Sequence, residues 1–275
     1  MLRVLAGREK KLNLYGPPDF IEQVRHKLQA YRWNLVDRYV RDLVFCVTEV
    51  APSLEIQKAV FRLKNAFVIE PQTGGVLAGS VVCSEPRFRV STAALDHGTP
   101  CLAFAVEESA HVNVWKTRLL ELGLQVGPWL KDLKRAIVEK RPNDHAINTG
   151  SFSASQQEKE MPLGTLRSVV TVTPGQKIAY VTDAADTAAN RAAIIKLVEN
   201  ADVLFIEAAF SQADASLAAE RAHLTAAAAG DIAREAAVRR IEPFHFSPRY
   251  AEDETRLLRE ALTAFAGASS PRRLA

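Results

Sequence analysis

Apolar positions along the chain follow two spacings, and these indicate strands and helices in succession. In the N-terminal part a helix opened by Pro17-Pro18 carries apolar residues at roughly helical spacing. A Gly-Thr-Pro turn at 98–100 lies between two apolar runs and predicts a hairpin. The strands that we expect in this part are 12–16, 42–50, 60–70, 88–97 and 101–108.

The pattern changes after residue 109. Two helical stretches are separated by Gly127-Pro128, and the polar segment 141–160 has no periodicity, so we expect a loop there. Strands and helices then alternate, which is typical of an α/β layered domain. We therefore expect a single domain over 1–275, with an inserted arm at 109–160 and a disordered tail at 267–275. The elements expected in this last part are strands at 177–183 and 202–210, mostly helix at 218–237, a strand within 239–250 and a helix at 252–266.

Composition limits the class of protein. Hydrophobic residues make up 48% of the 275 residues and charged residues 24%, an ordinary globular balance. No apolar run is long enough for a membrane-spanning helix. Three widely spaced cysteines fit a reducing cytoplasm better than a disulfide framework. The net charge of +3 permits an anionic substrate without requiring one.

Candidate chemistry gathers where predicted strands end. His97, Asp183, Glu207 and His245 each lie at or just beyond the C-terminal end of a strand, where α/β sheets bind ligands. His223 precedes a helix. Each residue alone also has an ordinary structural explanation, because an Asp after a strand is often a turn residue and a lone His is often a satisfied core or surface group. Spacing alone therefore supports only a weak metal-hydrolase hypothesis.

Several longer strings are more specific. From about Leu12 to Tyr250 the chain resembles the ribonuclease Z family in motif order and spacing, which implies a metallo-β-lactamase fold, an αββα sandwich of the α/β class. The strings that carry the resemblance are LYGP, LDHGTPCLAF, KIAYVTD, FIEAAF, AHLTAAAA and FHFSPRY.

The resemblance also implies a role for each residue. His97 would bind a first metal ion, Asp183 would bridge two ions, and His245 would bind the second. His223 would be the general acid that protonates the leaving oxygen, with Glu207 holding its imidazole. Two zinc ions can clamp a phosphodiester during in-line attack, and manganese is an alternative. The family usually has His where this chain has Ile206, which leaves a supporting contact open.

A larger departure concerns the rest of the metal site. Active members carry a His-x-His-x-Asp-His motif upstream of the LYGP strand, and this sequence has none. Each zinc needs about four donors, so we expect the chain as written to be inactive or impaired. A missing N-terminal segment explains this better than a true pseudoenzyme. The histidines present are His26, His97, His111, His145, His223 and His245.

The substrate implied by the resemblance is precursor tRNA, or another phosphodiester. Lys131, Lys134 and Arg135 follow the Gly-Pro turn and could bind a phosphate backbone. They could equally form the solvated face of an amphipathic helix. Ser247 and Arg249 follow His245 and could bind the scissile phosphate, although a salt bridge would explain Arg249 as well.

Two other functions stay open. Relatives of this fold hydrolyse small esters or phosphodiesters with a similar metal set, and a chain without metal would be a binding protein. The resemblance further suggests a homodimer.

Overall fold

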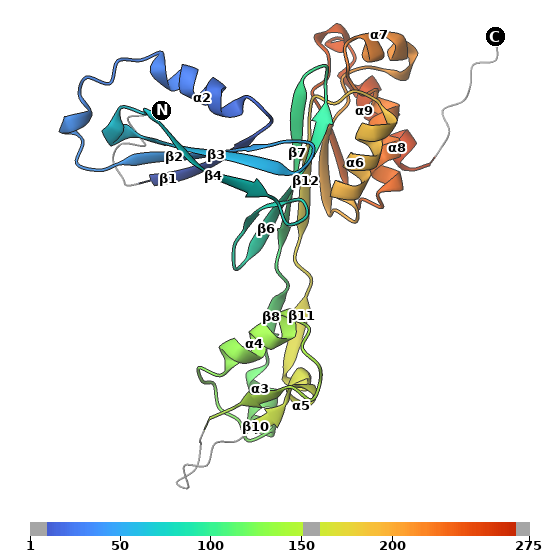
Figure 1. Cartoon of the computed structure of the whole chain (residues 1–275). Coiled ribbons are helices and arrows are strands. Elements are labelled where there is room, and N and C mark those ends of the chain that lie inside the picture. The colour runs from blue at the N-terminus through green and yellow to red at the C-terminus, as the bar shows by residue number, and fades with distance from the viewer. Residues whose placement is uncertain (1–9, 151–159, 268–275) are drawn as a thin grey trace. The chain divides into compact units, whose positions relative to one another are not determined.

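The computed structural model describes residues 10–150 and 160–267. It forms two compact units (Figure 1). One unit contains residues up to 85 together with 89–106 and the chain from 177 onward, and the other contains 86–88 and 107–176. The predicted tail, except for residue 267, and the middle of the predicted loop at 141–160 lie outside the described residues.

A four-stranded sheet forms the N-terminal part of the first unit, with strand order β1-β2-β3-β4. Strands β1 and β2 are parallel, and the other neighbouring pairs are antiparallel. The helix α2 packs on this sheet through Ile21, whose backbone N–H donates to the Glu49 carboxylate at 2.6 Å. The elements are β1 (Lys10–Gly16), α2 (Phe20–Gln29), a 3-10 turn (Val36–Arg38), β2 (Leu43–Val50), β3 (Glu55–Arg62) and β4 (Ile69–Val76).

The single strand predicted at 60–70 is wrong. Strand β3 ends at Arg62, a 3-10 turn follows at Leu63–Asn65, and β4 begins at Ile69. The chain reverses because Ala66 and Phe67 have positive φ, at 46° and 53°. The reversal places the Phe67 ring against Trp33, where it is fully buried. Burial of this aromatic ring offsets the backbone strain.

A six-stranded sheet forms the rest of the first unit, in the order β14-β13-β12-β7-β6-β5. The last three strands in sequence, β12, β13 and β14, are mutually parallel, so their C-terminal ends share one edge. Strands β6 and β7 are neighbours, as the predicted hairpin requires. The strands are β5 (Val81–Ser84), β6 (Phe88–Asp96), β7 (Pro100–Glu108), β12 (Lys177–Val181), β13 (Val203–Glu207) and β14 (Ile241–Phe244).

Helices rich in alanine cover this sheet (Figure 1). Thr187 and Thr225 cap α6 and α8 by accepting hydrogen bonds from backbone N–H groups three residues on. Helices α8 and α9 pack closely at Gly230, where an added Cβ would lie 2.2 Å from the Ala261 carbonyl oxygen. The elements are α6 (Ala188–Val198), a 3-10 turn (Gln212–Asp214), α7 (Ala215–Glu220), α8 (Ala226–Glu235), a 3-10 turn (Pro248–Tyr250) and α9 (Glu254–Phe265).

The second unit has its own apolar core around Trp129 and Leu133. The two helices predicted on either side of Gly127-Pro128 are present. The predicted loop at 141–160 is wrong in part, because 146–148 pairs with 160–162 and buries Ile147. The elements are β8 (His111–Val114), α3 (Lys116–Glu121), α4 (Leu130–Val138), β9 (Ala146–Asn148), β10 (Glu160–Pro162), α5 (Leu163–Leu166), a 3-10 turn (Arg167–Val169) and β11 (Val170–Thr173).

No helix in the described ranges has both the length and the apolar character needed to cross a membrane.

Candidate metal centre

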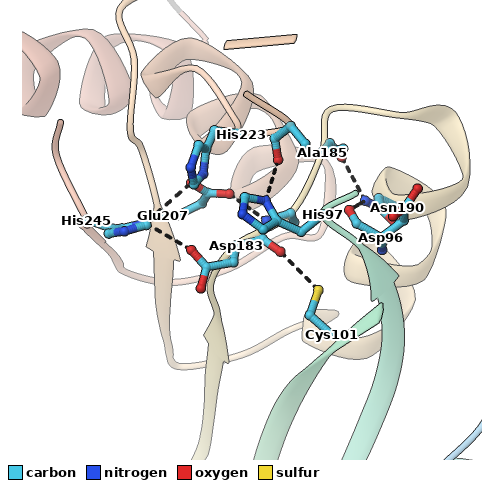
Figure 2. Close-up of polar contacts among 11 residues, drawn as sticks. Asp96, His97, Cys101, Asp183, Ala185, Asn190, Glu207, His223 and His245 are labelled. Carbon is cyan, nitrogen blue, oxygen red and sulfur yellow. Dashed lines mark hydrogen bonds and ion pairs between the residues drawn. The ribbon is translucent and has the colours of Figure 1, made fainter. Parts of the chain in front are cut away.

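The three parallel strands deliver three polar side chains to one edge of the sheet. Asp183 follows β12, Glu207 is the last residue of β13, and His245 follows β14. His97 comes from the turn after β6, and His223 from the segment before α8. Figure 2 shows these five side chains converging, although they come from five separate segments. The juxtaposition therefore depends on the parallel order of the strands.

The ligand atoms of these residues form two overlapping groups. Atoms of His97, Asp183 and His223 lie within 4.8 Å of one another, and so do atoms of Glu207, His223 and His245. The His245 Nδ1 atom lies 3.4 Å from the Asp183 carboxylate and 3.6 Å from that of Glu207. All five residues that the sequence predicted as metal ligands or catalytic groups thus lie in one cluster.

His97 is oriented by the backbone. Its Nδ1 atom lies 2.8 Å from the Ala222 carbonyl oxygen. A carbonyl can only accept, so Nδ1 carries the proton and Nε2 is left as the ligand atom. Because Ala222 is the neighbour of His223, this bond also joins the two histidines' segments. The two imidazole rings lie 4.5 Å apart between centroids.

Glu207 is buried, and its carboxylate contacts both Ala184 and His223. One carboxylate oxygen accepts from the Ala184 N–H at 2.6 Å, and the other lies 2.7 Å from His223 Nδ1. Burial raises the pKa of the Glu207 carboxyl to about 7, against the opposing effect of the Ala184 N–H. Burial, with the neighbouring His97, lowers the pKa of the His223 imidazole. Burial therefore disfavours the charged form of both groups.

Two of the predicted ligands have unusual backbone conformations. Asp183 has φ 49° and His245 has φ 63°, both in the left-handed region that L-residues rarely occupy. The Asp183 carbonyl accepts a hydrogen bond from the Cys101 thiol at 2.9 Å, which ties this segment to β7 (Figure 2). Burial, followed by the nearby Asp183, raises the pKa of the Cys101 thiol to about 11. The thiol is therefore a hydrogen-bond donor at neutral pH.

Asn190 is a residue that sequence reasoning missed. Its buried side chain donates to the backbone carbonyls of Asp96 and Ala185 and accepts from the Asp96 N–H, at 2.7, 2.8 and 3.0 Å (Figure 2). It therefore joins the turn that carries His97 to the loop that carries Asp183. The available signal was an uncharged polar residue in the first turn of a mostly apolar helix.

We expect Asn190→Ala to lower both stability and metal affinity. The change leaves buried backbone groups without partners, so the free energy of unfolding should fall by about 2 kcal/mol. Metal affinity should fall by roughly 10- to 100-fold, as for other residues that orient ligands. Chemical denaturation and metal titration would measure these effects.

Thr187→Ala is the matched control for Asn190→Ala. It removes the cap of the same helix, at a cost of about 1 kcal/mol, but breaks no contact to either ligand loop. Equal losses of metal affinity in both variants would contradict the role of Asn190.

The remaining predicted site residues lie in two places. Ser247 and Arg249 line a pocket of about 350 Å³ that His223 also lines. Arg249 makes no ion pair with any residue in the described ranges, so a salt bridge does not account for it there. The predicted basic residues of the arm belong to the second unit, where all three are exposed on α4; they are Lys131, Lys134 and Arg135.

The other histidines do not join the cluster within the described part of the chain. His26 is exposed on α2. His111 lies in β8, and His145 lies in a turn. Ile206, where the family usually has His, is fully buried in the apolar core.

Comparisons with known proteins agree with this geometry. A family model described as beta-lactamase superfamily domain matches residues 144–246. A ribonuclease Z of Deinococcus radiodurans is 29% identical over 269 residues, which cover 97% of this chain and 76% of the relative. A ribonuclease Z of Thermobifida fusca is 34% identical over 245 residues, which cover 85% of this chain and 69% of the relative. The chain belongs to the ribonuclease Z family.

Membership of the ribonuclease Z family confirms two predictions. The fold is the metallo-β-lactamase fold, and the chain is a ribonuclease Z-like hydrolase. Among solved structures, human tRNase Z, short form, aligns with 90% of this chain and 66% of its own, at 16% identity and a TM-score of 0.45.

The donor set fits the metal binding that the ribonuclease Z family implies. Imidazole nitrogens and carboxylate oxygens are the ligands that zinc prefers, and Asp183 and Glu207 add negative charge beside three histidines. His97, Asp183 and His245 supply three of these donors, and a zinc ion takes about four.

Proposed function

We propose that this protein is a metal-dependent endoribonuclease that cleaves a phosphodiester bond in precursor tRNA, with zinc as the metal and manganese as an alternative. The convergence of His97, Asp183, Glu207, His223 and His245 at one sheet edge carries the proposal. A bound metal ion would polarise the phosphodiester and lower the pKa of the attacking water. In this proposal His97, Asp183 and His245 hold the metal.

His223 is proposed as the general acid. Its Nδ1 faces the Glu207 carboxylate, so Nε2 is the atom that can pass a proton to the leaving oxygen. The buried Glu207 fixes the orientation of the ring through its contact with Nδ1. Ser247 and Arg249, at the adjacent pocket, would bind the phosphate through a hydroxyl and a bidentate guanidinium.

An RNA substrate is supported by the second unit. Lys134 and Arg135 line a pocket of about 610 Å³ together with Arg87, His111 and one acid, Glu139, so basic side chains outnumber acidic ones around this hollow. Lys131 lies exposed on the same helix. Such a surface suits a phosphate backbone, which is bound by charge and without sequence reading.

Cleavage assays on two substrates test the proposed function. The purified chain supplied with zinc should cleave both precursor tRNA and bis(p-nitrophenyl) phosphate, slowly because it lacks the His-x-His-x-Asp-His motif, and EDTA should stop both reactions. Cleavage of the small ester alone would favour the small-molecule hydrolase, and activity that persists in EDTA would contradict a metal mechanism. We also propose a cytoplasmic location, in view of the sparse cysteines, and a homodimer, which sedimentation would test.

The arm is tested by charge removal. Replacing Lys131, Lys134 and Arg135 together by Gln should lower kcat/KM for precursor tRNA by roughly 10- to 100-fold, because each phosphate contact contributes separately to RNA affinity. The loss on bis(p-nitrophenyl) phosphate should be far smaller. A triple variant at the exposed Lys27, Arg32 and Arg38 removes the same charge from the first unit and is the control. Equal losses on both substrates would remove the arm from the proposal.

A further inference from the structure

A pocket beside the metal centre is lined in part by Arg221, an arginine that has no part in the proposed function. The pocket measures about 350 Å³, and its lining includes His223, Ser247 and Arg249. Arg221 is a further lining residue, and Phe210 and Leu217 supply apolar surface. The Phe210 ring lies 5.9 Å from that of His223 between centroids. A volume of this order is enough for a small ligand.

Charges are separated between the metal centre and this pocket. The metal centre contains the carboxylates of Asp183 and Glu207, whereas the pocket is lined by the guanidinium groups of Arg221 and Arg249 and by no carboxylate. The Ser247 hydroxyl adds a donor. A ligand that satisfies two guanidinium groups, a hydroxyl and an apolar surface carries a phosphate and a flat or apolar part.

The position of Arg221 is tied to the metal centre through its backbone. Arg221 precedes Ala222, whose carbonyl accepts from His97, and His223 follows. The only ion pair recorded for Arg221 in the described ranges is with its neighbour Glu220, at 3.8 Å. Both side chains of that pair are more than half exposed, so the pair is weak and leaves the guanidinium available.

We propose that Arg221, together with Arg249, binds a backbone phosphate of the RNA on the leaving-group side of the cleaved bond. The inference rests on the proposed function, in which His223 passes a proton to the leaving oxygen. The group attached to that oxygen must extend from His223, and the pocket that His223 lines is the adjoining space with complementary charge. Arg221 is therefore a specificity residue that favours a nucleotide leaving group over a small one.

Binding measurements test the pocket without any turnover. Fluorescence anisotropy in EDTA would measure the affinity of the full chain for a labelled, unstructured RNA. Arg221→Gln should weaken binding by roughly tenfold and should reduce the slope of log affinity against log salt by about 0.7, the value for one lost contact on a single strand. Arg239→Gln is the control. Arg239 is exposed, lies just before β14 at the end of the strand away from His245, and pairs with Asp202. Equal affinities and equal slopes for the two variants would overturn the proposal.

Turnover tests the leaving-group side. The two substrates are RNA and the p-nitrophenyl ester of thymidine 5′-phosphate, whose leaving group has no phosphate. Arg221→Gln should lower the ratio of kcat/KM for RNA to kcat/KM for the ester by roughly tenfold, and Arg239→Gln should leave the ratio as it is. An unchanged ratio in Arg221→Gln would overturn the assignment. Failure of the unmodified protein on both substrates would overturn the proposed function instead, so the two failures are distinguishable.

Discussion

Replacing Asp183 by Asn should lower hydrolysis by at least roughly 10³-fold, which corresponds to about 4 kcal/mol of transition-state stabilisation. Asp183 is the carboxylate that lies near both His97 and His245, so the neutral amide removes the anionic donor beside these two histidines. Metal affinity should fall with activity. Metal titration and kinetics on bis(p-nitrophenyl) phosphate would measure both quantities.

Asn is the appropriate substitution because the backbone at 183 has positive φ. Asn tolerates this conformation better than Ala, so the metal-free variant should keep its free energy of unfolding within about 1 kcal/mol. A loss of function could not then be attributed to unfolding.

Asp186→Asn is the matched control for Asp183→Asn. It removes one negative charge from the same loop and breaks an ion pair with Arg191 in which both side chains are about one-third exposed. Metal affinity should change little in the control. A native metal affinity in Asp183→Asn would contradict the assignment of this residue as a ligand.

The second large effect is expected at His223. His223→Gln should lower kcat for RNA cleavage by roughly 10²- to 10⁴-fold, the usual contribution of a general acid. The loss should be much smaller with bis(p-nitrophenyl) phosphate, because nitrophenolate is a good leaving group and departs without a proton. Glu207→Gln should show the same substrate dependence with a smaller loss, since it acts through the orientation of His223.

The same experiment distinguishes two roles for His223. Its ligand atoms belong to both groups of metal donors, so it could bind the metal and not donate a proton. A metal ligand would give equal losses on both substrates and a lower metal affinity. A general acid would give unequal losses with the metal affinity of the native protein. His26→Gln, on the exposed face of α2, controls for loss of a histidine as such.

The alternation of strands and helices after residue 177 could be predicted from the sequence. The apolar runs 178–181 and 203–206 are each followed by polar residues, and such a local pattern can be read from consecutive positions. It placed Asp183, Glu207 and His245 at strand ends. The motif strings then assigned the family, because several of them recur in order along the chain.

Local patterns failed where a distant partner decided the structure. Strand 60–70 broke because burying Phe67 against Trp33 outweighed the apolar continuity of that run. The polar segment at 141–160 contains a strand because 160–162 pairs with it. Trp33 and residues 160–162 are distant in sequence from the residues that they contact, so the local spacing of apolar residues contains no information about these contacts.

Tertiary structure alone decided how the site is held together. The parallel order of β12, β13 and β14 brings Asp183, Glu207 and His245 to one edge. Asn190 joins two loops, one of them through a bond to Asp96, which is 94 residues away in the sequence. It also placed Arg221 at the pocket beside His223. Sequence determines which chemical groups are present and which local conformations are favourable. Distances between groups on different strands depend on long-range packing, which no short stretch of sequence encodes.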